Sequence, residues 1–225
     1  MAPARNTGSS ITRALRVVEA VAAAGDGVTP KAIARRLGIP LPSVYRAIGT
    51  LVEAGYLVRL HDVRGYGLGH RVSQLHRSLT EQMRPPAPVR AALHEVHARV
   101  GAAAYLAVLR DADVVLAHVD DCGEHPRPGL LGVGDALAPH GTAAGRALLG
   151  SVRAGAPVVV EEEFAPGTAG VAAPVRAVGG SGRGALGISI PVAELAIRRA
   201  ELERAVREAA ARISELAADP GARAP

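Results

Sequence analysis

Polar and basic side chains recur along one face of the segment 43–50. Its apolar residues have the three- and four-residue spacing of the other face of a helix: Val44, Ala47, Ile48 and Leu51. The face opposite these apolar residues is polar and almost free of acidic residues. Its members are Ser43, Tyr45, Arg46, Gly49 and Thr50. Arginine can fork onto guanine or hold a phosphate, and hydroxyl groups can donate hydrogen bonds to phosphate. This chemistry predicts contacts to duplex nucleic acid, and an ordinary solvated helix face is the alternative.

The elements around this segment predict how the polar face is positioned. Thr29 can cap a short helix over 30–37, because Pro30 suits its first position and the glycine and proline at 38–40 end it. The next helix then runs to residue 54, and an earlier amphipathic helix covers 10–24. Two short helices joined by a glycine-containing turn are typical of a helix-turn-helix.

A β-hairpin is predicted directly after these helices. Residues 56–60 and 64–68 have strand character and flank a turn near residues 61–62. A hairpin in this place is a wing, along which Arg59, Arg64 and Tyr66 would follow the nucleic-acid backbone or reach a minor groove. A plain structural hairpin is the alternative.

The charge of the chain is concentrated in its N-terminal third. Residues 1–77 carry eleven arginines and lysines against four acidic residues, a net charge of +7, whereas the whole chain carries +5. The remaining residues are therefore slightly acidic. This asymmetry is expected when one module neutralises phosphates and another has a different task.

Composition narrows the class of protein further. The 225 residues can bury a core without disulfides, since Cys122 is the sole cysteine, and no apolar run reaches membrane-spanning length. We expect a cytoplasmic protein with no membrane contact. No nucleophile with a base, phosphate-binding loop or dinucleotide fingerprint is recognisable, so we expect neither an enzyme nor a cofactor. The cluster His118, Asp120, Asp121, Cys122 and His125 fits no strong zinc pattern, and no metal site is predicted.

The rest of the chain predicts an α+β fold with an antiparallel sheet. A helix over 70–83 ends before the prolines of 84–88, which mark a domain boundary. The elements expected beyond it are a helix over 89–100, paired strands over 103–109 and 114–119, paired strands over 170–178 and 185–190 around the turn 179–184, and a helix over 194–216. We therefore expect domains at 1–69 and 87–219, with a linker helix in 70–86.

Several stretches, taken in order, resemble the IclR-type bacterial transcription regulators. They are SITRALRVVE at 10–19, IARRLGIP at 33–40, SVYR at 43–46, LVEAGYL at 51–57 and GYGLG at 65–69, followed by similar stretches at 137–149, 167–175 and 187–191. The resemblance implies a winged helix-turn-helix joined by a helical linker to a GAF-like effector domain. It also implies a repressor or activator that binds a pseudo-palindromic double-stranded operator as a homodimer or homotetramer.

The DNA-binding residues expected from the polar face and the resemblance fall into two groups. Phosphate contacts are expected from the basic residues of the helix-turn-helix and the wing, and base contacts from the helix over 43–54. The full set is Thr29, Lys31, Arg35, Arg36, Ser43, Tyr45, Arg46, Thr50, Arg64 and Tyr66.

The resemblance also implies a pocket for a small organic effector. Its positions are His140, Thr142, Ala143, Ala144, Val160, Gly170, Gly187 and Ser189. Ala143 and Ala144 supply backbone amides, but Val160, Gly170 and Gly187 replace the polar groups usual in the family, and the chain is short between Leu149 and Val158. These departures predict altered or weakened effector binding.

The acidic run and two alternative functions give three further expectations. The run 161–163 of three glutamates is expected to be a solvated strand end, because three adjacent carboxylates cannot all face one site. A vestigial pocket, with control passed to protein partners, is the first alternative function. A basic protein-interaction module that uses the helices over 70–83 and 194–216 is the second.

Overall fold

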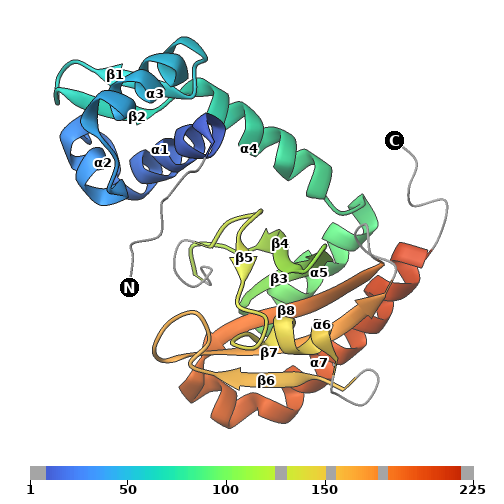
Figure 1. Cartoon of the computed structure of the whole chain (residues 1–225). Helices are drawn as coiled ribbons and strands as arrows, with labels where there is room; N and C mark the ends of the chain where they lie inside the picture. The colour runs from blue at the N-terminus through green and yellow to red at the C-terminus, as the bar shows by residue number, and fades with distance from the viewer. Residues whose placement is uncertain (1–8, 125–130, 151–155, 177–181, 219–225) are drawn as a thin grey trace, which may run out of the picture. The chain divides into compact units, whose positions relative to one another are not determined.

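The computed structural model describes residues 9–124, 131–150, 156–176 and 182–218 (Figure 1). The chain divides into two compact units, Met1–Ser78 and Leu79–Pro225. The division falls within the helix α4 (His70–Met83), which the sequence-based boundaries assign to a separate linker.

The N-terminal unit contains three helices, a two-stranded antiparallel hairpin and the first part of α4. Their bounds are α1 (Ser10–Ala24), α2 (Pro30–Leu37), α3 (Leu41–Glu53), β1 (Leu57–Leu60) and β2 (Gly65–Leu68). The Ser9 side chain caps α1 by accepting from the Thr12 N–H at 3.2 Å. The Thr29 hydroxyl caps α2 by accepting from the Ala32 N–H at 3.3 Å. The Thr29 cap and the hairpin lie where the sequence predicts them.

The core of the N-terminal unit is built from one face of each helix. α3 buries Val44, Ile48 and Leu51, the face predicted from their spacing. They pack with buried residues of the other elements: Val17, Ala20, Val21, Ile33 and Leu57. Because α3 is anchored through this face, its other face is turned away from the core.

The C-terminal unit is built around a six-stranded antiparallel sheet in the order β5-β4-β3-β8-β7-β6. The strands are β3 (Ala103–Arg110), β4 (Asp113–Asp120), β5 (Ala136–Leu137), β6 (Val158–Glu161), β7 (Thr168–Arg176) and β8 (Arg183–Pro191). The helices are α5 (Ala87–Val100), α6 (Ala143–Leu149) and α7 (Val192–Ala218). The predicted α+β class is confirmed. β5 was not predicted, and of β6 only the end at the acidic run 161–163 was predicted. The predicted turn 179–184 lies partly outside the described residues.

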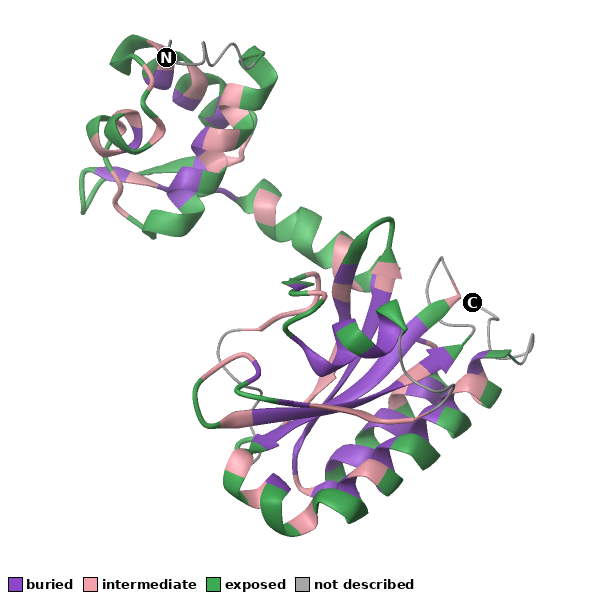
Figure 2. Ribbon diagram, turned by 60° about the horizontal axis from the view of Figure 1, so that its bottom comes forward, coloured by how far each residue is buried: buried purple, intermediate pink, exposed green. Residues whose placement is uncertain are grey.

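Helices cover the two faces of this sheet unequally. The long helices α5 and α7 pack on one face over a large apolar core. The short helix α6 packs on the other face, where a smaller core includes Tyr105, Ala143, Val160 and Ala172. β7 and β8 are therefore buried along almost their whole length, as Figure 2 shows. Residues between α6 and the sheet are removed from water.

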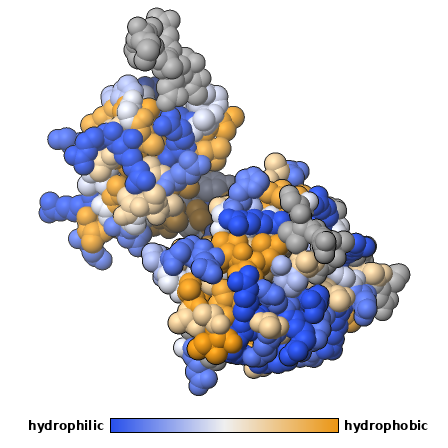
Figure 3. All heavy atoms as spheres, turned by 90° about the horizontal axis from the view of Figure 1, so that it is seen from below, coloured by the Kyte–Doolittle hydropathy of each residue, from blue (hydrophilic) through white to orange (hydrophobic). Residues whose placement is uncertain are grey.

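The outer surface of the C-terminal unit mixes hydrophilic and apolar side chains on the face seen in Figure 3. Ile197, on α7, is a large apolar residue that is exposed on this unit. Among the described residues, no helix has both the length and the apolar character needed to cross a membrane.

Candidate functional sites

The polar face of α3 is open to solvent. Tyr45 is 54% exposed, Arg46 and Thr50 are exposed, and Ser43 is half-buried near the start of the helix. The Thr50 hydroxyl donates to the Arg46 carbonyl at 3.3 Å. A Cβ added at Gly49 would meet no atom within 4 Å, so the middle of this face is free of the chain's own side chains.

Basic side chains of the same unit are also exposed. Lys31, Arg35 and Arg36 lie on α2, and Arg64 lies in the hairpin turn with a left-handed φ of 49°. The structure thus places these predicted phosphate contacts on the surface of the unit that contains α3. Two other predicted residues have structural contacts of their own: Thr29 caps α2, and Tyr66 is half-buried against the core.

The predicted effector positions converge on the sheet face beneath α6. Val160, Gly170 and Ser189 are register partners on three neighbouring strands, β6, β7 and β8. Gly187 lies two residues from Ser189 on β8 and pairs with Tyr105 of β3. Since side chains alternate along a strand, these positions share one face.

The segment at the start of α6 closes over this face. The Thr142 hydroxyl caps α6 by accepting from the Gly145 N–H at 3.1 Å, and it donates to the Ala138 carbonyl at 2.9 Å. Ala143 and Ala144 are fully buried. His140 is exposed, and its carbonyl accepts from Arg146 Nε at 2.8 Å. The structure therefore gathers the Ala143 amide with the sheet positions and leaves the His140 side chain outside.

Glu163 occupies the space between α6 and the sheet. Its side chain is 0% exposed. The Ala143 N–H donates to its Oε1 at 2.6 Å, and the Tyr105 hydroxyl lies 3.5 Å from both carboxylate oxygens. The expectation that residues 161–163 form a solvated strand end is wrong for this residue. Glu161 and Glu162 are exposed, but a left-handed φ of 58° at Glu162 turns the next side chain inward.

Burial sets the ionisation of this pair. Removal from water raises the pKa of Glu163 from 4.5 to about 7, against the Ala143 N–H, the Tyr105 hydroxyl and the charge of Arg146, which all favour the carboxylate. Burial, followed by the charge of Glu163, raises the pKa of Tyr105 well above its ordinary value. Tyr105 therefore remains a hydrogen-bond donor at neutral pH.

Two glycines make room for these side chains. A Cβ at Gly170 would overlap the Glu163 carboxylate, and a Cβ at Gly187 would overlap the Tyr105 ring. Glycine therefore replaces the family's polar residues at these two effector positions because a larger residue would not fit beside Glu163 and Tyr105. Glu163 is the residue that sequence reasoning missed, and no sequence signal separates it from its two acidic neighbours.

The other clusters considered from the sequence do not form comparable sites. Among the described residues, no three histidine, cysteine or acidic side chains are grouped to hold a metal ion, and His125 lies outside those residues. Cys122 is exposed. Burial, as the largest influence, lowers the pKa of His118.

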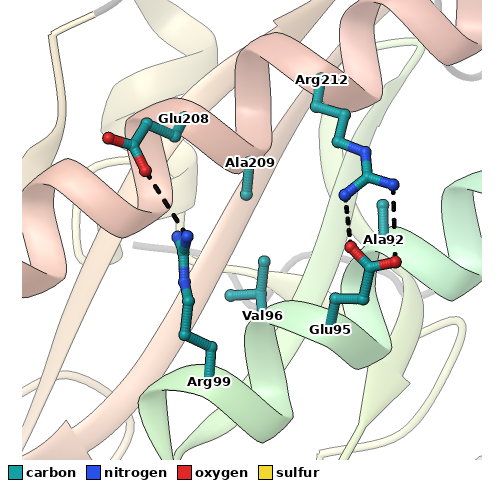
Figure 4. A pocket seen from close by; sticks show the side chains of 7 residues that line it. All are labelled: Ala92, Glu95, Val96, Arg99, Glu208, Ala209 and Arg212. Carbon is teal, nitrogen blue, oxygen red and sulfur yellow. Dashed lines mark hydrogen bonds and ion pairs between the residues drawn. The ribbon is translucent and has the colours of Figure 1, made fainter.

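A shallow pocket of about 150 Å³ lies between α5 and α7 (Figure 4). Its walls carry two ion pairs, Arg99 with Glu208 at 3.5 Å and Arg212 with Glu95. Small apolar side chains, including Val96, lie between these pairs. Because each positive charge is matched by a negative one, the pocket offers no net charge to a ligand.

Comparison with known proteins identifies the N-terminal unit. Residues 10–61 match the IclR helix-turn-helix domain. No curated protein matches the chain as a relative. Solved structures similar in fold cover almost the whole chain, at sequence identities that show the fold alone.

Three of these structures illustrate the likeness. An IclR family transcriptional regulator from Brucella abortus has 18% identity and a TM-score of 0.72, with 96% of each chain covered. The Thermotoga maritima IclR has 17% identity and a TM-score of 0.68, over 93% of this chain and 99% of that chain. An IclR homologue from Microbacterium hydrocarbonoxydans, complexed with 4-hydroxybenzoate, has 21% identity and a TM-score of 0.65, over 93% and 99%.

The matched domain defines a DNA-binding helix-turn-helix, and the fold of the chain is shared with solved transcription regulators. Its helix-turn-helix is of the IclR type, so the resemblance predicted from the sequence is confirmed. The matched domain and the structures of similar fold are those of transcription regulators, which agrees with the expectation that the chain is not an enzyme.

Proposed function

We propose that this chain is a cytoplasmic regulator that binds a pseudo-palindromic operator as a homodimer or homotetramer and responds to a small organic effector. The observation that carries the DNA-binding part is the outer face of α3. It combines the exposed Tyr45, Arg46 and Thr50 with the open space at Gly49, and residues 43–50 include no acidic side chain. A helix with such a face can enter the major groove and present donors to base edges.

The division of labour within the N-terminal unit follows from exposure and charge. Lys31, Arg35, Arg36 and Arg64 hold the protein on phosphate, where their charges release counterions. Ser43, Tyr45 and Arg46 read or approach the bases. We assign Thr29 and Tyr66 mainly to holding α2 and the hairpin in place, because the first caps a helix and the second packs against the core.

Association into a homodimer is supported by apolar residues left uncovered on α1. Ile11 is 71% exposed and Leu15 is 59% exposed, one helical turn apart. A second copy that covers them would also supply a second recognition helix. Two such helices, one DNA turn apart, match a pseudo-palindromic operator.

The effector is proposed to act in the C-terminal unit beneath α6. A protein of similar fold was solved with 4-hydroxybenzoate, a small organic acid. In this chain the space at Ala143, Gly170 and Gly187 contains the side chains of Glu163 and Tyr105. We therefore propose that effector binding differs from the mode that the family resemblance implies. A ligand that favours one arrangement of the two readers needs only a few kcal/mol of differential affinity to change operator binding.

Selection of genomic DNA fragments by the purified protein tests this function. We expect retained fragments with a footprint of two half-sites about one helical turn apart. The logarithm of the affinity should fall linearly with the logarithm of the salt concentration. A basic protein-interaction module would show the salt dependence without a footprint. Control by a partner protein through a vestigial pocket would leave the footprint intact and insensitive to small acids.

A further inference from the structure

A carboxylate belonging to the chain itself lies in the proposed effector site. Glu163 is fully buried, and its Oε1 accepts from the Ala143 N–H at 2.6 Å. The Tyr105 hydroxyl lies within 3.5 Å of both oxygens. A buried carboxylate is costly unless donors surround it, and this site supplies two.

The surroundings are shaped for this carboxylate. Gly170 lies directly beneath it, since a Cβ there would overlap the Glu163 oxygens. Gly187 leaves the Tyr105 ring the space from which its hydroxyl reaches Glu163. The aromatic ring of Phe164 closes one side, edge-on to Tyr105 with ring centres 6.0 Å apart.

The backbone around Glu163 is held in a costly conformation. Glu162 and Phe164, on either side of it, both have left-handed φ angles of 58° and 63°. Non-glycine residues adopt such angles only at a cost in free energy. Several hydrogen bonds hold the loop, among them the Glu163 N–H donating to the Thr168 carbonyl at 3.0 Å and the Gly167 N–H donating to the Glu162 carboxylate at 2.9 Å.

We propose that Glu163 is an internal ligand that keeps the effector site closed in the resting protein. An external anion can then bind the Ala143 amide only by displacing Glu163, together with the loop 162–167 that carries it. This inference rests on the proposed effector function of the C-terminal unit. It adds an intramolecular competitor to that function and identifies the segment that must move when the site opens.

Displacement has a direct structural consequence. The loop joins β6 to β7, and its far end is bonded at Gly167 to Val192, the first residue of α7, at 2.9 Å. Release of Glu163 therefore frees a segment that connects the sheet face beneath α6 to α7, which packs on the opposite face. A closed site also weakens the binding of any external anion, because the apparent affinity equals the intrinsic affinity multiplied by the fraction of protein in which the site is open.

Calorimetric titration of the full-length protein with sodium acetate at neutral pH tests the proposal. We expect Glu163→Ala, which vacates the carboxylate position, to bind acetate at least about tenfold more tightly than the wild type, because no competitor remains. Acetate should also raise the melting temperature of this variant more than equimolar sodium chloride does. Glu161→Ala removes an exposed neighbouring carboxylate and should behave as the wild type.

Equal acetate affinity of the wild type and Glu163→Ala, or no detectable binding to either, would overturn the proposal. If Glu163→Ala does not fold, Glu163→Asp gives the same reading, since its carboxylate is one methylene shorter and falls short of the Ala143 amide. DNA retention is measured on the same samples. Wild-type protein that binds its operator while the variants gain no acetate binding refutes only the internal ligand, whereas failure to bind any DNA refutes the regulator function.

Discussion

The buried carboxyl of Glu163 predicts an unusual dependence of stability on pH. Its pKa rises from 4.5 in the unfolded chain to about 7 in the folded protein. The folded state therefore holds the proton more tightly, so this contribution is fully present below about pH 4.5 and is lost as pH rises through 7. At about 1.4 kcal/mol per tenfold change in proton affinity, the free energy of unfolding should fall by about 3 kcal/mol between pH 4.5 and pH 8.

Urea unfolding at several pH values, followed by circular dichroism, measures this effect. Glu163→Gln keeps the shape and an acceptor for the Ala143 N–H but cannot ionise, so it should lack this decline. The difference between the two pH profiles isolates Glu163, because histidines such as His118 titrate in both proteins. Profiles that stay parallel from pH 4.5 to 8 would refute the reasoning. Glu161→Gln, at an exposed position, should retain the wild-type profile.

Three other predictions follow from packing and exposure. Gly170→Ala should lower the free energy of unfolding by about 1–3 kcal/mol, because its Cβ overlaps the Glu163 carboxylate. Adding Glu163→Ala should restore much of that loss in a double-mutant cycle, and additive losses would contradict the contact. Gly49→Ala should raise thermal stability by about 0.5–1 kcal/mol, since the site is an exposed helix interior, yet weaken operator binding in a titration. Stronger or unchanged DNA binding would remove Gly49 from the interface. Ile11→Ser should shift the protein toward monomer in light scattering, whereas Ile197→Ser, also highly exposed, should not; a dimer that persists in Ile11→Ser would exclude α1 from the interface.

Local patterns in the sequence were sufficient for most of the fold. The spacing of Val44, Ile48 and Leu51 predicted the buried face of α3, and the capping residue Thr29 predicted where α2 begins. Such features depend on interactions between residues a few positions apart. β5 is only two residues long, and β6 leads into an acidic run, so neither carries a clear period. Their pairing with the edge-facing strands β4 and β7 decides their structure.

The buried site was harder to predict because its contacts are long-range. Glu163 meets Ala143, 20 positions away, and Tyr105, 58 positions away. In the sequence Glu163 is indistinguishable from Glu161 and Glu162. The left-handed backbone at Glu162 interrupts the alternation of side chains, so simple strand periodicity assigns the wrong direction.

The wing shows a similar limit. Arg59, Arg64 and Tyr66 have the same candidate role in the sequence. In the fold Arg59 and Arg64 are exposed, but Tyr66 packs against the core, and its backbone N–H donates to the Val28 carbonyl at 3.0 Å. An aromatic residue on a short strand can either contact DNA or pack against the core. Only the packing of the loop before α2 decides between these two roles.

The central claim is that the outer face of α3 reads DNA, and Arg46 is its most direct test. Operator affinity should be measured on a selected genomic fragment for Arg46→Ala and for Arg77→Ala, an exposed arginine of α4 whose loss changes the net charge equally. We expect Arg46→Ala to lose about 1–3 kcal/mol of binding free energy and its footprint, and Arg77→Ala to retain the footprint. An unchanged footprint in Arg46→Ala would contradict the account.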